Sequence, residues 1–285
     1  MDIPQQAPAR RVTSAERGGA DRFGAIVTDM WAHRFALRNL VMKDFRIRYR
    51  NMSLGMIWSV LNPLTMLGVL VVIFTYVYPQ EGQAYFPVSV LLGLVSYNLL
   101  SLCIPAATGA VLENAALVKK TVFPRQLLPI SVVLSQTLQI LVQLGLVVIF
   151  MVLFRVPVTV KFLLAPFIFG VLLLFVIGVG LTCSALSVIF RDVRYIVESY
   201  LTILFWLSPV FYPLTIVHQK FPKLVFGVYV LNPLAGCIEA LRRVLLYDRY
   251  PDGVSFAIAV IVSVSTLVMG FALFSRLQRR FADLV

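Results

Sequence analysis

The chain has 285 residues, of which 60% are hydrophobic and 13% are charged, and its formal net charge at pH 7 is +12. A chain with so few polar residues cannot cover an ordinary soluble globule. In addition, several apolar stretches reach the roughly 20 residues that cross a bilayer. The positive charge lies between the apolar stretches rather than on a basic recognition helix, so membrane topology explains it and no nucleic-acid partner is expected. The sequence predicts an all-α membrane protein in contact with membrane lipids.

The first 50 residues are polar and basic. Residues 1–22 are rich in Ala, Arg, Gln, Pro and Gly, which predicts a flexible tail. Over residues 23–50, apolar side chains such as Phe23, Met30 and Phe45 recur at helical spacing. This pattern predicts an amphipathic helix at the membrane interface. No cleavable signal peptide is visible, so the first apolar span is expected to direct insertion itself.

Six apolar spans follow and make up a membrane domain over residues 51–285. They cover about residues 56–78, 86–112, 126–154, 162–189, 195–213 and 255–274. The segments on one side of these spans, termini included, carry 18 Lys and Arg residues, and those on the other side carry 7. By the positive-inside rule, both termini are expected in the cytoplasm.

The stretch KDFRIRYRNMSLGMIWSVLNPL, residues 43–64, passes from four cations in its first eight residues directly into the first span. The cations can bind the anionic cytoplasmic leaflet, which topology alone would explain. Topology does not explain Asn62-Pro63, because proline removes an amide donor and leaves a carbonyl that needs another partner inside the membrane. This break is therefore expected to face a helix interface or a conduit.

The segment 214–254 is too apolar for an ordinary loop, and Pro222, Pro233 and Pro251 interrupt it too often for a clean span. Two short helices that dip into the outer leaflet and return, near residues 214–250, would fit it. Such re-entrant pieces are stable only where they are buried in protein or line a cavity.

Charged and aromatic groups stand near the ends of the spans. Residues 113–125, ENAALVKKTVFPR, fit a short amphipathic helix on the cytoplasmic surface and a solvated basic turn equally well. Glu239 is spaced to pair with Arg242 or Arg243, most simply as a structural contact. Around Ser208-Pro209, both an interfacial aromatic belt and a ring-lined passage for sugars fit the four rings. These rings are Phe205, Trp206, Phe211 and Tyr212.

The sequence lacks the common motifs for catalysis and ATP binding. It contains no G-x-x-x-x-G-K-[ST], H-E-x-x-H, nucleophile elbow or C-x-x-C. His33 and His218 are isolated, and Cys103, Cys183 and Cys237 show no metal-ligand spacing. The chain is therefore expected not to be an enzyme and to hold no metal or cofactor.

Five stretches, spread over about residues 30–283, carry a resemblance to a known family. They are FRIRYRNMSLGMIWSVLNPL, NAALVKKTVFPRQLLP, VIFRDVRYIVESYLTILFWLSPVFYP, VLNPLAGCIEALRRVLL and FSRLQRRFAD. In this order they resemble the permease subunits of type-two ABC exporters, and the closest branch exports polysaccharides, O-antigen and teichoic acid.

The resemblance implies a homodimer of six-span subunits in the bacterial inner membrane, with re-entrant helices before the last span. Two copies of a separate ATPase subunit, which bind ATP and Mg, would dock on the cytoplasmic side, and the cargo would be a lipid-linked glycan. Two kinds of alternative stay open. One keeps the fold and exports a drug or a lipid, and the other is a stand-alone membrane carrier or a glycan-modifying enzyme.

The resemblance also implies roles for individual residues. Coupling to the ATPase would fall to Asn114, Leu117, Lys119, Lys120, Phe123 and Pro124. The cytoplasmic gate, which would receive the diphosphate of the glycan lipid, would comprise Lys43, Arg46, Arg48, Tyr49 and Arg50. The conduit candidates are Asn62, Phe205, Trp206, Phe211 and Tyr212. The re-entrant segment would carry Asn232, Pro233, Glu239, Arg242 and Arg243.

Overall fold

The computed structural model describes residues 33–49, 57–73, 76, 85–120, 124–214, 216–217 and 222–281. Within these ranges the secondary structure is helical and contains no β-strand, which confirms the predicted all-α class. The predicted tail, residues 1–22, and the first part of the predicted interfacial helix, residues 23–32, lie outside the described residues.

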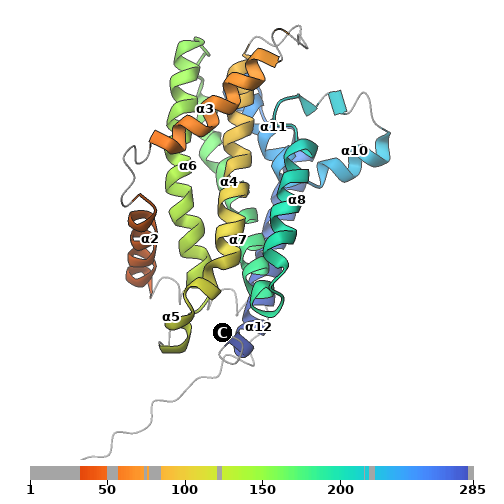
Figure 1. The fold of residues 1–285 in the computed structure, drawn as a ribbon. Helices are drawn as coiled ribbons and strands as arrows, with labels where there is room; N and C mark the ends of the chain where they lie inside the picture. Colours follow the sequence, from red (N-terminus) through yellow and green to blue (C-terminus); the bar gives the residue numbers. More distant parts are fainter. Residues whose placement is uncertain are drawn as a thin grey trace, which may run out of the picture.

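Four long helices form the central bundle (Figure 1). The shortest has 25 residues and so is about 37 Å long, more than the roughly 30 Å of a hydrocarbon layer. All four are long and apolar enough to cross a membrane, as predicted for these segments. They are α4 (Phe86–Glu113), α6 (Leu127–Leu153), α7 (Ala165–Ile189), which follows the 3₁₀ turn η2 (Val160–Leu164), and α12 (Gly253–Leu277), which η3 (Gln278–Arg280) extends.

Two further apolar helices are shorter than the spans predicted there. α3 (Ile57–Val72) and α8 (Val193–Leu207) have 16 and 15 residues, and both pack against α4. α8 was expected to reach residue 213, but Pro209 disfavours helical backbone at Ser208, where φ is −92° and ψ is 151°. In Figure 1, α3 crosses α6 and α4 obliquely near their upper ends, and α8 lies to the right of α4.

The remaining helices are short and lie at the two ends of the bundle. α2 (Arg34–Tyr49) packs beside α6, and α5 (Ala115–Lys120) follows α4 at the lower end in Figure 1. The segment 113–125 therefore contains a short helix rather than a turn alone. α10 (Lys223–Val230) and α11 (Pro233–Leu246) are two short helices that precede α12, and α10 projects from the bundle.

Glycine allows α7 and α12 to pack backbone against backbone. A Cβ atom at Gly178 would lie 2.6 Å from the backbone nitrogen of Leu267, closer than real Cβ contacts come. Gly270 faces the carbonyl of Gly178 in the same way, so neither position accepts a side chain. Small residues at helix crossings are the usual means of close packing inside membranes.

Candidate functional site

The predicted gate and the predicted coupling segment meet at the lower end of the bundle. Lys43 Nζ of α2 donates a hydrogen bond to Asn114 Oδ1 at 3.3 Å. Asn114 stands between α4 and α5, and its Nδ2 donates to the carbonyl of Ala110 at 2.9 Å. Two groups of residues that the sequence assigned to different functions therefore touch directly.

The other gate candidates differ in what they contact. Arg48 Nη1 donates to Gln136 Oε1 of α6, so this cation is engaged in holding α2 against the bundle. Arg46 is exposed on α2. Burial raises the pKa of Asp44, and the neighbouring Lys43 and Arg48 counteract this shift. The side chain of Tyr49 and all of Arg50 lie outside the described residues.

α5 is anchored by its apolar face and exposes a cation. Val118 is buried in a cluster with Phe274 and Phe281, and Leu117 packs against the same cluster. Lys119 is exposed, while the side chain of Lys120 and residue Phe123 lie outside the described residues. The carbonyl of Pro124 accepts the N–H of Leu127 at 3.0 Å at the start of α6. An exposed helix fixed from behind can pass a push from a docked protein into the bundle.

The end of α12 supports this segment from the other side, which the sequence did not indicate. Arg125 Nη1 donates to the carbonyl of Gln278 at 2.6 Å, and Gln126 Nε2 donates to Ser275 Oγ at 2.8 Å. The rings of Phe274 and Phe281 pack edge to face with their centroids 5.3 Å apart. The signal available in the sequence was the run FSRLQRRFAD, in which a fully buried phenylalanine follows three cations.

α3 presents polar groups on an exposed face. Asn62 and Thr65 are exposed although they lie within an apolar helix, and Thr65 Oγ1 donates to the carbonyl of Asn62 at 2.8 Å. Pro63, next to Asn62, is buried. Within a hydrocarbon layer, an exposed polar side chain needs water or protein beside it rather than lipid.

α8 exposes most of its surface. Only Val197, Leu201 and Leu204 are buried, as one narrow stripe against the bundle. The exposed part mixes polar and aromatic groups: Arg194, Glu198, Ser199, Tyr200, Thr202 and Trp206. Arg194 and Glu198 form an ion pair at 3.5 Å along the helix. A purely lipid-facing helix would be more uniformly apolar.

The aromatic conduit candidates form one continuous set of ring contacts. Phe205 packs edge to face on Tyr97 of α4 and on Trp206, with centroids 4.9 and 5.2 Å apart. Phe211 contacts Phe205, Trp206 and Tyr212. Phe205 is partly buried, whereas Trp206 is 62% exposed. Trp206 is therefore the ring of this set best placed to meet a solute.

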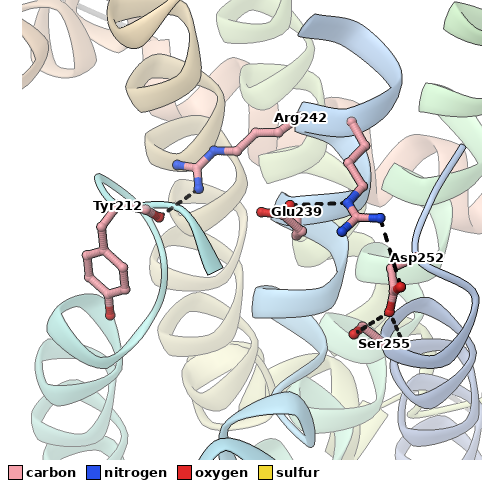
Figure 2. A network of polar contacts seen from close by, with 6 residues as sticks. Tyr212, Glu239, Arg242, Asp252 and Ser255 are labelled. Atoms are coloured by element: carbon pink, nitrogen blue, oxygen red, sulfur yellow. Dashed lines mark hydrogen bonds and ion pairs between the residues drawn. The ribbon is translucent and has the colours of Figure 1, made fainter. Parts of the chain in front are cut away.

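α11 holds the bend after α8 through a buried arginine (Figure 2). Arg242 donates to the carbonyls of Val210, Tyr212 and Ser89 at 2.6, 2.9 and 3.3 Å. Three backbone carbonyls from α4 and the bend thus share one guanidinium, which can donate five hydrogen bonds. Gly93 passes so close to Val210 that no Cβ would fit there.

The neighbouring arginine forms the ion pair predicted for Glu239. Arg243 Nε lies 3.2 Å from Glu239 Oε1, and Arg243 Nη1 lies 3.9 Å from Asp252 Oδ1. Asp252 accepts hydrogen bonds from the backbone N–H and the hydroxyl of Ser255 at the start of α12. These two bonds lower the pKa of Asp252. Figure 2 shows this chain of contacts linking α11 to α12.

The start of α11 is tied to the end of α8. Asn232 caps α11 by accepting the N–H of Leu234 at 3.1 Å, and Pro233 occupies the first turn. Asn232 Nδ2 also donates to Ser208 Oγ at 3.1 Å. The hydroxyls of Tyr212 and Tyr229 lie 3.0 Å apart. The structure thus brings the re-entrant and aromatic candidates together at one end of the bundle, away from the gate and coupling residues.

Among the described residues, no three His, Cys, Asp or Glu side chains gather to hold a metal ion. The site is instead a set of helix surfaces: a basic end with α2 and α5, an exposed face on α3 and α8, and an aromatic end held by α11. Such surfaces suit binding and movement of a solute.

Proteins of similar sequence are known. The chain is 27% identical over 258 residues to the O-antigen export system permease protein RfbA of Myxococcus xanthus, covering 90% of this chain and 98% of that protein. It is 27% identical over 248 residues to the O-antigen export system permease protein RfbA of Klebsiella pneumoniae, covering 85% and 92%. The polysialic acid transport protein KpsM of Escherichia coli is 24% identical over 244 residues, covering 82% and 90%. The sequence model of the ABC-2 type transporter family matches residues 36–246, more than half of the chain, and together with the four long apolar helices this places the chain in that family as a multi-pass membrane protein.

Proposed function

We propose that this chain is the membrane permease subunit of an ATP-driven exporter that moves a lipid-linked polysaccharide across the bacterial inner membrane. The observation that carries the proposal is the match of 82–90% of the chain to two O-antigen export system permease proteins and to a polysialic acid transport protein. The exposed face that mixes hydroxyls, charges and rings on α8 agrees with a hydroxylated cargo.

The power for transport would come from a partner. We propose that two copies of an ATPase subunit, holding ATP and Mg, dock on α5 and use Lys119, Lys120 and Phe123 as contacts. Closure of the ATPase dimer would push α5, and the Lys43–Asn114 bond would pass this movement to α2. The anchoring of Leu117 and Val118 supports this role, because a firmly held helix transmits force instead of yielding.

The membrane arrangement is also a proposal. α3 and α8 would be the first and fifth of six spans, and α10 with α11 would form the re-entrant segment before α12. The excess of Lys and Arg at one end supports cytoplasmic termini. In this arrangement residues 1–22 are a cytoplasmic tail, residues 23–50 the interfacial gate helix, and residues 51–285 the transmembrane domain.

A second copy of the chain would complete the conduit. The exposed face of α3 and α8 is unsuited to lipid at Asn62, Glu198 and Thr202. Placed against a second copy, this face would enclose a path between the two subunits. Lys43 and Arg46 at its cytoplasmic end would attract the diphosphate of the lipid carrier, and Trp206 at its other end would stack on sugar rings.

Reconstitution tests this function. Vesicles that contain the chain together with its ATPase partner are expected to move a radiolabelled lipid-linked glycan from the ATPase side only when MgATP is present. Vesicles with the chain alone are the control, and transport in them would contradict the need for a partner. Transport of drugs or plain lipids at the same rate as glycan would favour the alternative cargo.

A further inference from the structure

Proline at position 63 leaves a specific carbonyl of α3 without its helical donor. In an α-helix the N–H of residue 63 would bond to the carbonyl of residue 59, but proline has no N–H. Pro63 and Ser59 are both buried residues of α3, and the helix continues through Pro63. The carbonyl of Ser59 therefore cannot accept a hydrogen bond from residue 63.

A side chain of α6 supplies that donor. Gln143 Nε2 donates to the carbonyl of Ser59 at 2.9 Å, across 84 residues of sequence. The side chain of Gln143 is buried, so water does not compete for this bond. The side-chain amide of Gln143 thus donates the hydrogen bond that the N–H of residue 63 would donate in a helix without proline.

A third helix fixes which way the amide of Gln143 points. Asn98 Nδ2 of α4 donates to Gln143 Oε1 at 3.0 Å, and this leaves the NH₂ group of Gln143 to face Ser59. One chain of two hydrogen bonds therefore joins α4, α6 and α3 at the proline. In these apolar surroundings, the polar groups that join the three helices have few other hydrogen-bond partners.

We propose that Gln143 is a positioning residue for α3: it replaces the backbone donor lost at Pro63, Asn98 orients it, and the pair holds the helical turn that contains Pro63 at a fixed place against α4 and α6. The inference rests on the proposed function in one respect, namely that α3 lines the export path. Asn62, next to Pro63 in this turn, lies on the exposed face of α3. Loss of the bond would free α3 to shift and would misplace this face.

A neighbouring glutamine provides a matched control. Gln139 lies four residues before Gln143, on nearly the same face of α6. Its Oε1 is buried and has no hydrogen-bond partner within the part of the chain that the structure describes. Gln139→Leu therefore makes the same chemical change in the same helix without removing a bond to α3.

A double-mutant cycle tests the inference on the purified complex of the chain with its ATPase partner in lipid nanodiscs. The proteins are wild type, Q143L, P63A and Q143L/P63A, with Q139L as control. Q143L is expected to lower Tm by about 5 °C. In P63A the backbone N–H restored at position 63 can bond to the carbonyl of Ser59, so adding Q143L there is expected to lower Tm by less than half as much. An equal decrease in both backgrounds, or none in wild type, would overturn the inference.

The export rate per folded complex shows whether Gln143 positions α3 for transport or only stabilises the fold. Q143L is expected to lower the maximal export rate at least threefold with an unchanged KM for ATP, and Q139L to leave the rate unchanged. An unchanged rate per folded Q143L complex would overturn the positioning role. Absence of glycan export in every protein, wild type included, would count against the proposed function alone, because the Tm cycle still reports on Gln143.

Discussion

Lys43 of α2 and Asn114 at the start of α5 are joined by a hydrogen bond of 3.3 Å, although 71 residues separate them in the sequence. Asn114 is held in turn by the carbonyl of Ala110 in the last turn of α4. The bond is exposed, so it contributes less than about 1 kcal/mol to folding. Its importance lies in its place, because it links the proposed gate to the proposed coupling helix.

Asn114→Ala removes both bonds and tests this link. We expect folding to change by less than about 1 kcal/mol, and the amount of glycan exported per ATP hydrolysed to fall several-fold, because movement of α5 no longer draws α2 with it. ATP hydrolysis and export are measured in the same vesicles. Arg38→Ala, which removes an exposed cation from α2, is the matched control. An unaltered ratio in the Asn114 variant would reject the link.

Reversal of charge at Lys119 tests the docking of the ATPase subunit on α5. Lys119 is exposed, so Lys119→Glu should not affect folding or insertion. We expect affinity for the ATPase subunit to fall at least tenfold, equal to about 1.4 kcal/mol. Arg191→Glu, an exposed cation at the end of α7 outside α5, is the control. Binding is measured by titrating labelled ATPase subunit onto nanodiscs, and equal affinities for both variants would refute the docking site.

The positions of most helices could be predicted from the sequence because membranes enforce a simple rule. Backbone groups in hydrocarbon must bond within the helix, so apolar length alone marks α4, α6, α7 and α12. The same rule placed α3 and α8 but not their ends. The end of α8 at Leu207 depends on Pro209, which also allowed a kinked continuation.

Contacts between distant segments could not be predicted in this way. Glu239 was spaced to reach either Arg242 or Arg243, and only the folded chain gives Arg243 to Glu239 and Arg242 to backbone carbonyls. Gln143 and Asn98 stand within apolar stretches of the sequence, 45 residues apart, and nothing in the sequence pairs them. Their partners depend on which faces of three helices meet, and helical periodicity in one segment does not contain that information.

Arg242 is expected to be the most sensitive position of α11. Arg242→Met removes the donors of three carbonyls, of which Val210 and Ser89 accept in buried surroundings. We expect the free energy of unfolding to fall by about 3 kcal/mol, since buried acceptors left unpaired are costly. The measurement is thermal unfolding in detergent. Arg249→Ala, which removes an exposed cation, is the control and should change the free energy of unfolding little. An Arg242→Met variant as stable as wild type would contradict the role of the guanidinium.

Asp252 gives stability a defined dependence on pH. Hydrogen bonds from Ser255 lower its pKa below the ordinary value of 3.8, so the folded state binds the proton less tightly than the unfolded state. This contribution is complete above the ordinary pKa and is lost as pH falls through the pKa of the folded state. We expect Asp252→Ala to cost about 1 kcal/mol at pH 7 and less at pH 3, below the ordinary pKa. Unfolding of both proteins at the two pH values checks this, and a difference independent of pH would contradict it.

Trp206 should act on the cargo rather than on the fold. Its ring is 62% exposed, so Trp206→Ala should leave Tm within a few degrees of wild type. If the ring stacks on sugar, we expect glycan export to slow about tenfold, and Trp206→Phe, which keeps an apolar ring face, to restore much of the rate. Phe167→Ala, at an exposed ring on α7, is the control for loss of aromatic surface. The assay is initial export rate at fixed ATP, with ATP hydrolysis in the absence of glycan as the reference. If Trp206→Ala and Phe167→Ala slow export equally, the ring serves membrane anchoring instead of cargo contact.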